Sequence, residues 1–137
     1  MKKINKLRLG AFIVCALVMG ACASGAPGTV HNSRNSLDWA GTYVGHTPSA
    51  SGMGIDVRLT LTRDGTYVLQ QHYVGRDDPD FRSTGSFTWD SAGRVITLSY
   101  GNGSPHYQVG ENMLRQLDMA GRIITGNLAE MYILRKE

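Results

Sequence analysis

The stretch Ile55-Asp56-Val57-Arg58-Leu59-Thr60-Leu61 decides the fold class. Apolar and polar side chains alternate through it, which is the period of a strand with one dry face and one wet face. Arg63-Asp64-Gly65-Thr66 follows, and Asp-Gly between alternating runs is a strong local indication of a hairpin turn. The segment from Tyr67 to Val74 then predicts the returning strand.

The same alternation and the same turn residues recur along the rest of the chain. They predict further strands at residues 41–47, 82–89, 94–100, 107–110, 113–118, 122–126 and 131–135. No segment has a convincing helical period, although one short helical turn is expected near residues 126–130. Evenly spaced strands with tight connections predict an all-β antiparallel meander, and about eight such strands close into an up-and-down barrel because closure removes exposed edges. A barrel of this size is either filled by its own side chains or holds one small ligand.

The first 21 residues are typical of a targeting segment. Four basic residues open the chain, and an uncharged apolar run extends from Leu9 to Ala21. This run matches a signal-peptide core and is shorter than the ~20 residues that a membrane-spanning helix needs. It ends Val18-Met19-Gly20-Ala21-Cys22, which resembles the bacterial lipobox and predicts lipidation of Cys22, with palmitate among the acyl chains. The alternative is ordinary secretion with cleavage near Ala23 or Ala26.

Composition changes once this segment is set aside. The whole-chain isoelectric point near 9.0 depends on the four basic residues before Cys22, and the remainder carries ten Lys and Arg against eleven Asp and Glu. No basic stripe with interleaved aromatic residues remains, so nucleic-acid binding is not expected. Cys15 lies in the targeting segment and Cys22 would be acylated, which leaves no thiol for redox chemistry or metal binding.

The mature chain divides into two parts. Small and polar residues predict a flexible tether over residues 22–36, including the lipidated cysteine. The barrel domain is expected over residues 37–137, starting near Leu37 or Trp39. Four aromatic residues are expected to plug the barrel ends and core, or alternatively to line a pocket for an apolar ligand: Trp39, Tyr43, Phe87 and Trp89.

A series of patches resembles one family. They are Trp39 to Gly45, Pro48, Gly54-Ile55, Leu59 to Leu61, Asp64 to Tyr67, Gly85 to Trp89, Ile96 to Leu98, Val109 to Asn112, Leu117-Asp118 and Ile124 to Gly126. In this order, over about residues 37–135, they resemble the N-terminal domain of the NlpE copper-resistance lipoproteins. The resemblance implies a single-domain, lipocalin-like barrel on an outer-membrane lipoprotein. It also implies links to copper tolerance, to sensing of surface contact, and to envelope-stress signalling to a two-component system.

One departure from the family concerns the segment after the first predicted strand. The family typically has a Cys-x-x-Cys pair there, whereas this chain has Ser49 and Gly52 at the matching positions. Serine and glycine supply no thiolate, the soft ligand that favours Cu(I). Copper is therefore implied by the resemblance alone and does not carry over to these residues.

Other candidate ligands lack a ligand spacing. His46 and Met53 flank one loop and are the strongest of several weak candidates for copper ligands. The others are His72, His106 and Met113. Surface histidines and core or rim methionines are the competing interpretation. Three carboxylates around Pro79, those of Asp77, Asp78 and Asp80, could hold Ca²⁺ but match no EF-hand and are typical of a solvated turn.

The sequence does not predict an enzyme. It contains no Gly-x-Ser-x-Gly elbow, no Ser-x-x-Lys, no His-Glu-x-x-His and no phosphate-binding glycine loop. We therefore expect a non-catalytic lipoprotein on the periplasmic face of the outer membrane, acting in copper homeostasis or envelope-stress sensing through an envelope protein partner. The alternatives are a lipocalin-like carrier of a small apolar ligand and an inhibitor of a periplasmic lysozyme or other hydrolase.

Overall fold

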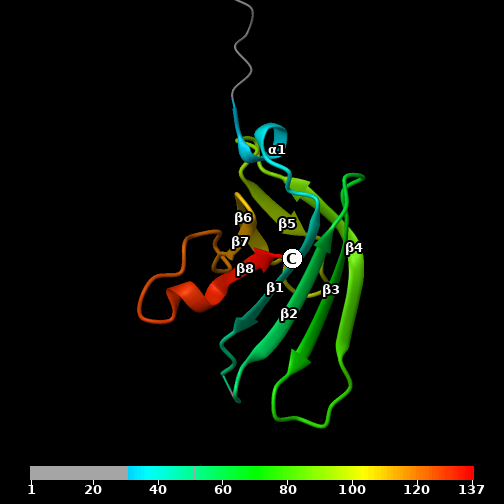
Figure 1. The fold of residues 1–137 in the computed structure, drawn as a ribbon, viewed down its shortest axis with the longest axis vertical. Helices are drawn as coiled ribbons and strands as arrows, with labels where there is room; N and C mark the ends of the chain where they lie inside the picture. The colour runs from blue at the N-terminus through cyan, green and yellow to red at the C-terminus, as the bar shows by residue number, and fades with distance from the viewer. Residues whose placement is uncertain (1–30, 51) are drawn as a thin grey trace, which may run out of the picture.

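The fold is an eight-stranded antiparallel barrel in which the strands follow chain order and the last pairs with the first (Figure 1). The structure, a computed structural model, describes residues 31–50 and 52–137. Its strands are β1(Gly41–Thr47), β2(Ile55–Leu61), β3(Thr66–Tyr73), β4(Phe81–Trp89), β5(Val95–Leu98), β6(His106–Gly110), β7(Met113–Gln116) and β8(Ile133–Lys136). The prediction of an all-β meander that closes into a barrel is confirmed.

The hairpin between β2 and β3 forms at the Asp-Gly pair. Thr62 and Thr66 close the turn through a backbone hydrogen bond of 3.0 Å, and the Asp64 carboxylate accepts the Thr66 N–H at 3.1 Å. Gly65 has φ +84, a left-handed conformation that costs glycine little. The turn fixes the register, so Leu59 faces Leu69 and Leu61 faces Tyr67 across the pair.

The interior of the barrel is filled by its own side chains. Burial alternates along β2, β5 and β6, and several large side chains of the barrel are less than 2% exposed: Tyr43, Leu59, Leu61, Tyr67, Ile96, Leu98, Leu114 and Leu134. Burial, and secondarily the charge of Asp38, raises the pKa of Tyr43 to about 12, and the Tyr43 hydroxyl donates to the Trp39 carbonyl at 2.7 Å. This packing explains why the alternating pattern was such a strong fold indication.

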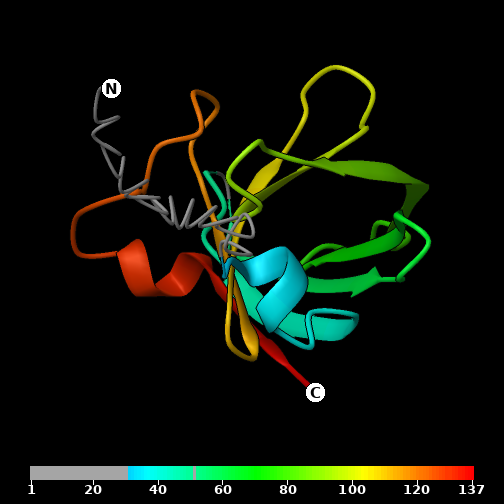
Figure 2. The same ribbon diagram turned by 90° about the horizontal axis from the view of Figure 1, so that it is seen from above.

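One end of the barrel is closed by aromatic rings, as expected. Trp39 meets the rings of Phe87 and Trp89 edge-on, with centroids 5.8 and 5.4 Å apart. Above them lies α1(Ser33–Ser36), which covers this end in the view from above (Figure 2). The aromatic cluster therefore closes this end of the barrel, and the same three rings also line an open hollow of about 350 Å³ beside Arg34 and Arg63.

Residues 33–36, expected in the flexible tether, form this helical turn instead. Asn32 caps it, with a reciprocal side-chain exchange between Asn32 and Asn35. Ser33 Oγ donates to the Val109 carbonyl at 2.7 Å, and the Arg34 N–H donates to the Gly93 carbonyl at 3.0 Å. These bonds fasten the turn to the barrel. The predicted signal peptide and the predicted lipidation site, Cys22, lie outside the described residues.

The predicted strand at residues 122–126 is wrong. The segment belongs to the long β7–β8 loop (residues 117–132), where only a bridge between Leu117 and Ile123 resembles strand pairing. Asp118 accepts hydrogen bonds from the Ala120 and Arg122 N–H groups, and so turns the chain back before a ladder can form. The short helical turn expected near residues 126–130 appears as η1(Ala129–Tyr132).

The barrel closes along a short seam between β1 and β8. Tyr43 pairs with Lys136 and Val44 with Arg135, and the Glu137 N–H donates to the Thr42 carbonyl at 2.9 Å. Two side-chain contacts reinforce this seam: Lys136 reaches Asp38 with its ammonium group, and the carboxylate of Glu137 pairs with Arg58. Within the described ranges, no helix is long and apolar enough to cross a membrane.

Candidate functional site

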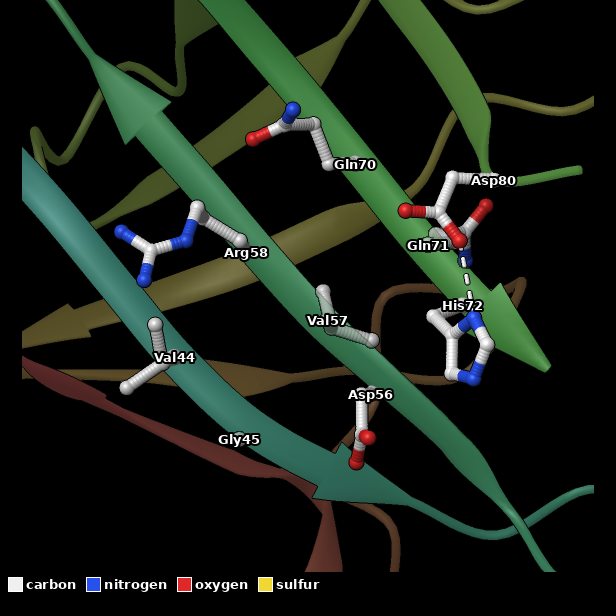
Figure 3. Close-up of a pocket in the computed structure, with 9 residues that line it drawn as sticks. All are labelled: Val44, Gly45, Asp56, Val57, Arg58, Gln70, Gln71, His72 and Asp80. Atoms are coloured by element: carbon white, nitrogen blue, oxygen red, sulfur yellow. Dashed lines mark hydrogen bonds and ion pairs between the residues drawn. The ribbon is translucent and has the colours of Figure 1, made fainter. Parts of the chain in front are cut away.

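A hollow of about 520 Å³ lies on the outer face of β1, β2 and β3 (Figure 3). Strand alternation directs the side chains of even-numbered residues out of the barrel here. The hollow is lined by Val44, Gly45, Asp56, Val57, Arg58, Gln70, Gln71, His72 and Asp80. It opens on the outer side of the sheet, and one of its lining residues, Val57, also belongs to the packed core.

The charged groups of the hollow are already paired. Arg58 binds the Glu137 carboxylate through two parallel hydrogen bonds of 2.6 and 2.7 Å, a bidentate geometry that is stronger and more directional than a single contact. His72 Nδ1 lies 2.8 Å from Asp80 Oδ1, the interaction dashed in Figure 3. None of the nine lining residues is a serine, threonine, cysteine or lysine. The hollow therefore offers donors and acceptors for recognition, and its two carboxylates are each engaged by a histidine.

His46 lies beside the hollow and ties the β1–β2 loop to the sheet. Its Nε2 lies 3.0 Å from the Met53 carbonyl oxygen, to which it donates, and its Nδ1 lies 2.7 Å from Asp56 Oδ1. The hydrogen bond to Asp56, followed by that to Met53, raises the pKa of His46, because both acceptors favour the protonated ring. Gly54 permits this contact: a Cβ there would stand 2.2 Å from His46 Nε2.

These contacts affect whether His46 and Met53 can bind copper together. The structure brings His46 to the main-chain oxygen of Met53, not to its sulfur, and both ring nitrogens are engaged in hydrogen bonds. The Met53 methyl group packs instead against Gly75. A metal at His46 would have to displace one of these bonds.

Ser49 and Gly52 lie close together in the same loop. The Ser49 hydroxyl oxygen is 3.9 Å from the position that a Cβ on Gly52 would occupy. The two positions are therefore neighbours in space, but neither residue supplies a sulfur.

The remaining ligand candidates are dispersed. His106 meets the Thr97 hydroxyl at 2.8 Å, and Asp78 approaches Arg76 at 3.8 Å while Asp80 pairs with His72. Among residues 31–50 and 52–137, no three His, Cys, Asp or Glu side chains converge as a metal site would require. The structure therefore brings together neither the wider histidine and methionine set nor the carboxylates around Pro79.

Two contacts at the hollow were missed by sequence reasoning. His72 and Asp80 were considered separately, one as a copper candidate and the other as a calcium candidate, although the β3–β4 hairpin places them side by side. The Arg58–Glu137 pair joins residues 79 positions apart. No local pattern marks such a pair, whereas strand alternation could have placed Asp56 opposite His46 and His72.

Comparison with known proteins matches this barrel to one family. The family model of the NlpE N-terminal domain matches residues 43–127. Lipoprotein NlpE of Escherichia coli strain K12 is 34% identical over 85 residues, which are 61% of this chain and 36% of that protein. The chain thus spans little more than a third of the length of this curated relative.

Two solved structures share the fold. One, from Shewanella oneidensis and provisionally described as a lipoprotein, is 49% identical with a TM-score of 0.73, covering 77% of this chain and 95% of that one. The other is the Cpx pathway activator NlpE from Escherichia coli, 26% identical with a TM-score of 0.54, covering 64% of this chain and 46% of that one.

Proposed function

Because the chain belongs to the NlpE N-terminal domain family, we propose that it is a non-catalytic envelope lipoprotein that signals envelope stress through contact with a protein partner. The observation that carries the proposal is the family match over residues 43–127, which runs from β1 into the β7–β8 loop. NlpE of Escherichia coli, described as a Cpx pathway activator, supplies the class of function.

The outer face of β1, β2 and β3 supports a contact role. Its charges are held in fixed pairs, so the surface presents a preorganised polar pattern. The carboxylates of Asp56 and Asp80, which line the hollow, are each held by a histidine. We place the partner-binding surface at this hollow.

The proposed attachment is a lipid on Cys22, at the periplasmic face of the outer membrane. The lipobox-like sequence before Cys22 and the alanine after it support this placement. One acyl chain gives only marginal membrane binding, whereas two or more hold a protein firmly. The proposal thus predicts that the chain partitions with membranes only when Cys22 is present.

The test is a Cpx-responsive reporter in an Escherichia coli strain without its own NlpE. Overproduction of this chain should raise reporter output, and a variant of the hollow, Arg58→Gln with Gln70→Ala, should lower the response at equal abundance. The control joins residues 1–30 to an unrelated soluble domain, because excess lipoprotein alone can stress the envelope. A response no larger than that of this control would contradict the proposal.

For copper, we propose that the β1–β2 loop has lost the thiolate site of the family. Calorimetric titration of the barrel with Cu(I) under anaerobic conditions, and with Cu(II) in air, should give no tight binding. Tight one-site binding that is abolished by His46→Ala with Met53→Ala would instead mean that other ligands have replaced the cysteines.

A further inference from the structure

The exposed apolar side chains of the barrel gather on one loop. Of the six large hydrophobic residues that are exposed among the described residues, four lie in the β7–β8 loop: Met119 (76% exposed), Ile123 (52%), Leu128 (52%) and Met131 (37%). The loop stands away from the barrel wall in both views (Figures 1 and 2). An exposed apolar cluster of this kind marks an interaction site more often than a scattered set does.

The loop is held in shape by its own hydrogen bonds. Asp118 Oδ1 accepts from the Ala120 and Arg122 N–H groups, both at 2.9 Å, and Asp118 Oδ2 pairs with Arg122 Nε at 2.9 Å. In its second half, the Met131 N–H donates to the Leu128 carbonyl at 3.0 Å. The apolar side chains are therefore presented on a fixed support, which lowers the entropy cost of binding.

Unpaired positive charge flanks the loop on both sides. Arg115 on β7 and Arg135 on β8 point out of the barrel, and within the part of the chain that the structure describes neither makes an ion pair. Strands β5, β6, β7 and β8 contain no acidic residue. Arg122 is neutralised by Asp118. The loop and its flanking strands thus carry Arg115 and Arg135 against Glu130, with Glu111 in the adjoining β6–β7 turn.

We propose that the β7–β8 loop docks the barrel on an anionic lipid surface, with its apolar side chains entering the headgroup region and Arg115 and Arg135 meeting lipid phosphates. Apolar insertion combined with basic flanks is the pattern of interfacial membrane contacts. The inference rests on the proposed lipid anchor, because the anchor keeps the loop near a membrane.

The anchor leaves enough reach for this contact. Ten peptide units separate Cys22 from Asn32, and a fully extended chain of that length spans at most about 35 Å. A folded domain of roughly 100 residues is about 30–35 Å across. The barrel can therefore lie on its side with the loop against the bilayer while the lipid stays inserted.

A second copy of the chain fits the loop less well. A stable interface buries about 800 Å² on each partner, which is more than four side chains on one narrow loop provide. The alternative binding surface for the loop is a groove on a protein partner, and the experiment below distinguishes such a groove from a lipid surface.

The experiment uses residues 31–137, which contain the whole closed barrel and its cap. Sedimentation with phosphatidylethanolamine–phosphatidylglycerol vesicles should pull down this unlipidated domain at low salt. Pure phosphatidylcholine vesicles should bind it more weakly, and added salt should release it.

Paired variants identify the contact. Met119→Ser with Leu128→Ser should reduce the vesicle partition coefficient by about tenfold or more. Arg115→Gln and Arg135→Gln should each reduce it about fivefold. Met53→Ser with Phe81→Ser, which removes the exposed apolar side chains outside the loop, is the matched control and should bind as the unaltered domain does. Circular dichroism verifies folding.

Two results would overturn the inference: no sedimentation of the folded domain with anionic vesicles, or equal loss in the loop variant and the control. Either result would leave a groove on a protein partner as the remaining binding surface for the loop. Neither result would contradict the proposed signalling role, which is measured with the reporter and not with vesicles.

Discussion

Ser49 and Gly52 determine the chemistry of the β1–β2 loop. The positions are adjacent in space, with 3.9 Å between the Ser49 hydroxyl and the site of a Gly52 Cβ. That Cβ would also lie 3.9 Å from the Val74 carbonyl, an ordinary contact. A side chain can therefore be added at residue 52 without moving the sheet, so the proposed loss of a thiolate pair needs no change of fold.

Ser49→Cys with Gly52→Cys should create a thiolate pair. We expect the double variant to bind one Cu(I) per chain under anaerobic conditions, since soft sulfur ligands favour Cu(I). In air it should form a disulfide, detectable by thiol titration. Either single variant is the control and should do neither. Failure of the double variant to bind copper or to oxidise would show that the loop does not bring the two positions together.

His46 makes the stability of this loop dependent on pH. The pKa of His46 is raised in the fold by Asp56 and then by Met53. Its stabilising effect is complete below the unfolded pKa of about 6.5 and is lost as pH rises through the higher folded pKa. The pH window therefore lies above the ordinary value.

His46→Gln should lower the denaturant midpoint more at about pH 5 than at about pH 9, since only the protonated ring donates to both partners. Urea unfolding followed by tryptophan fluorescence measures both midpoints. His106→Gln, which removes a ring that meets the Thr97 hydroxyl, is the control for loss of a histidine. An equal effect of His46→Gln at the two pH values would contradict the charge-dependent contact.

At the scale of elements, alternation predicted most strands and failed where side chains competed for the backbone. The bounds of β1 and β2 agree with those expected, because period-two burial and tight turns act locally. Residues 122–126 contain Ile123, Ile124 and Thr125, which favour strands. Asp118 outweighs this strand propensity because its carboxylate accepts hydrogen bonds from the Ala120 and Arg122 N–H groups.

The prediction missed the helical turn α1 for the opposite reason. Asn32 and Asn35 have the spacing of a capping box, but the polar composition around them predicted a tether. The contact of Ser33 with Val109 fixes the turn, and it joins residues 76 positions apart. Such long-range bonds, like Arg58 with Glu137, leave no trace in a local pattern.

At the scale of the whole molecule, the filled core leaves no room for an internal ligand among its tightest side chains. Leu134 of β8 is fully buried and lies so close to Gly45 of β1 that a Cβ there would stand 2.6 Å from Leu134 Cδ2. The core thus reinforces the seam from the inside, beneath the Arg58–Glu137 pair on the outside.

Leu134→Ala should lower the free energy of unfolding by about 2–5 kcal/mol, because it removes buried methyl groups and leaves a cavity. Chemical denaturation in urea measures the change. Arg135→Ala, at the exposed neighbouring position, is the control and should change stability by less than about 0.5 kcal/mol. A cost below about 1 kcal/mol for Leu134→Ala would mean that the seam is not a packed part of the core.

The β1–β8 seam also has a kinetic consequence for each newly made molecule. Neighbouring hairpins of the meander can pair as soon as both arms exist, since their contacts are local. The first strand, however, acquires its second neighbour only when β8 arrives, at the far end of the chain. Until then the folding chain is an open sheet with two unpaired edges, and a product truncated before β8 stays able to pair with other chains rather than with itself.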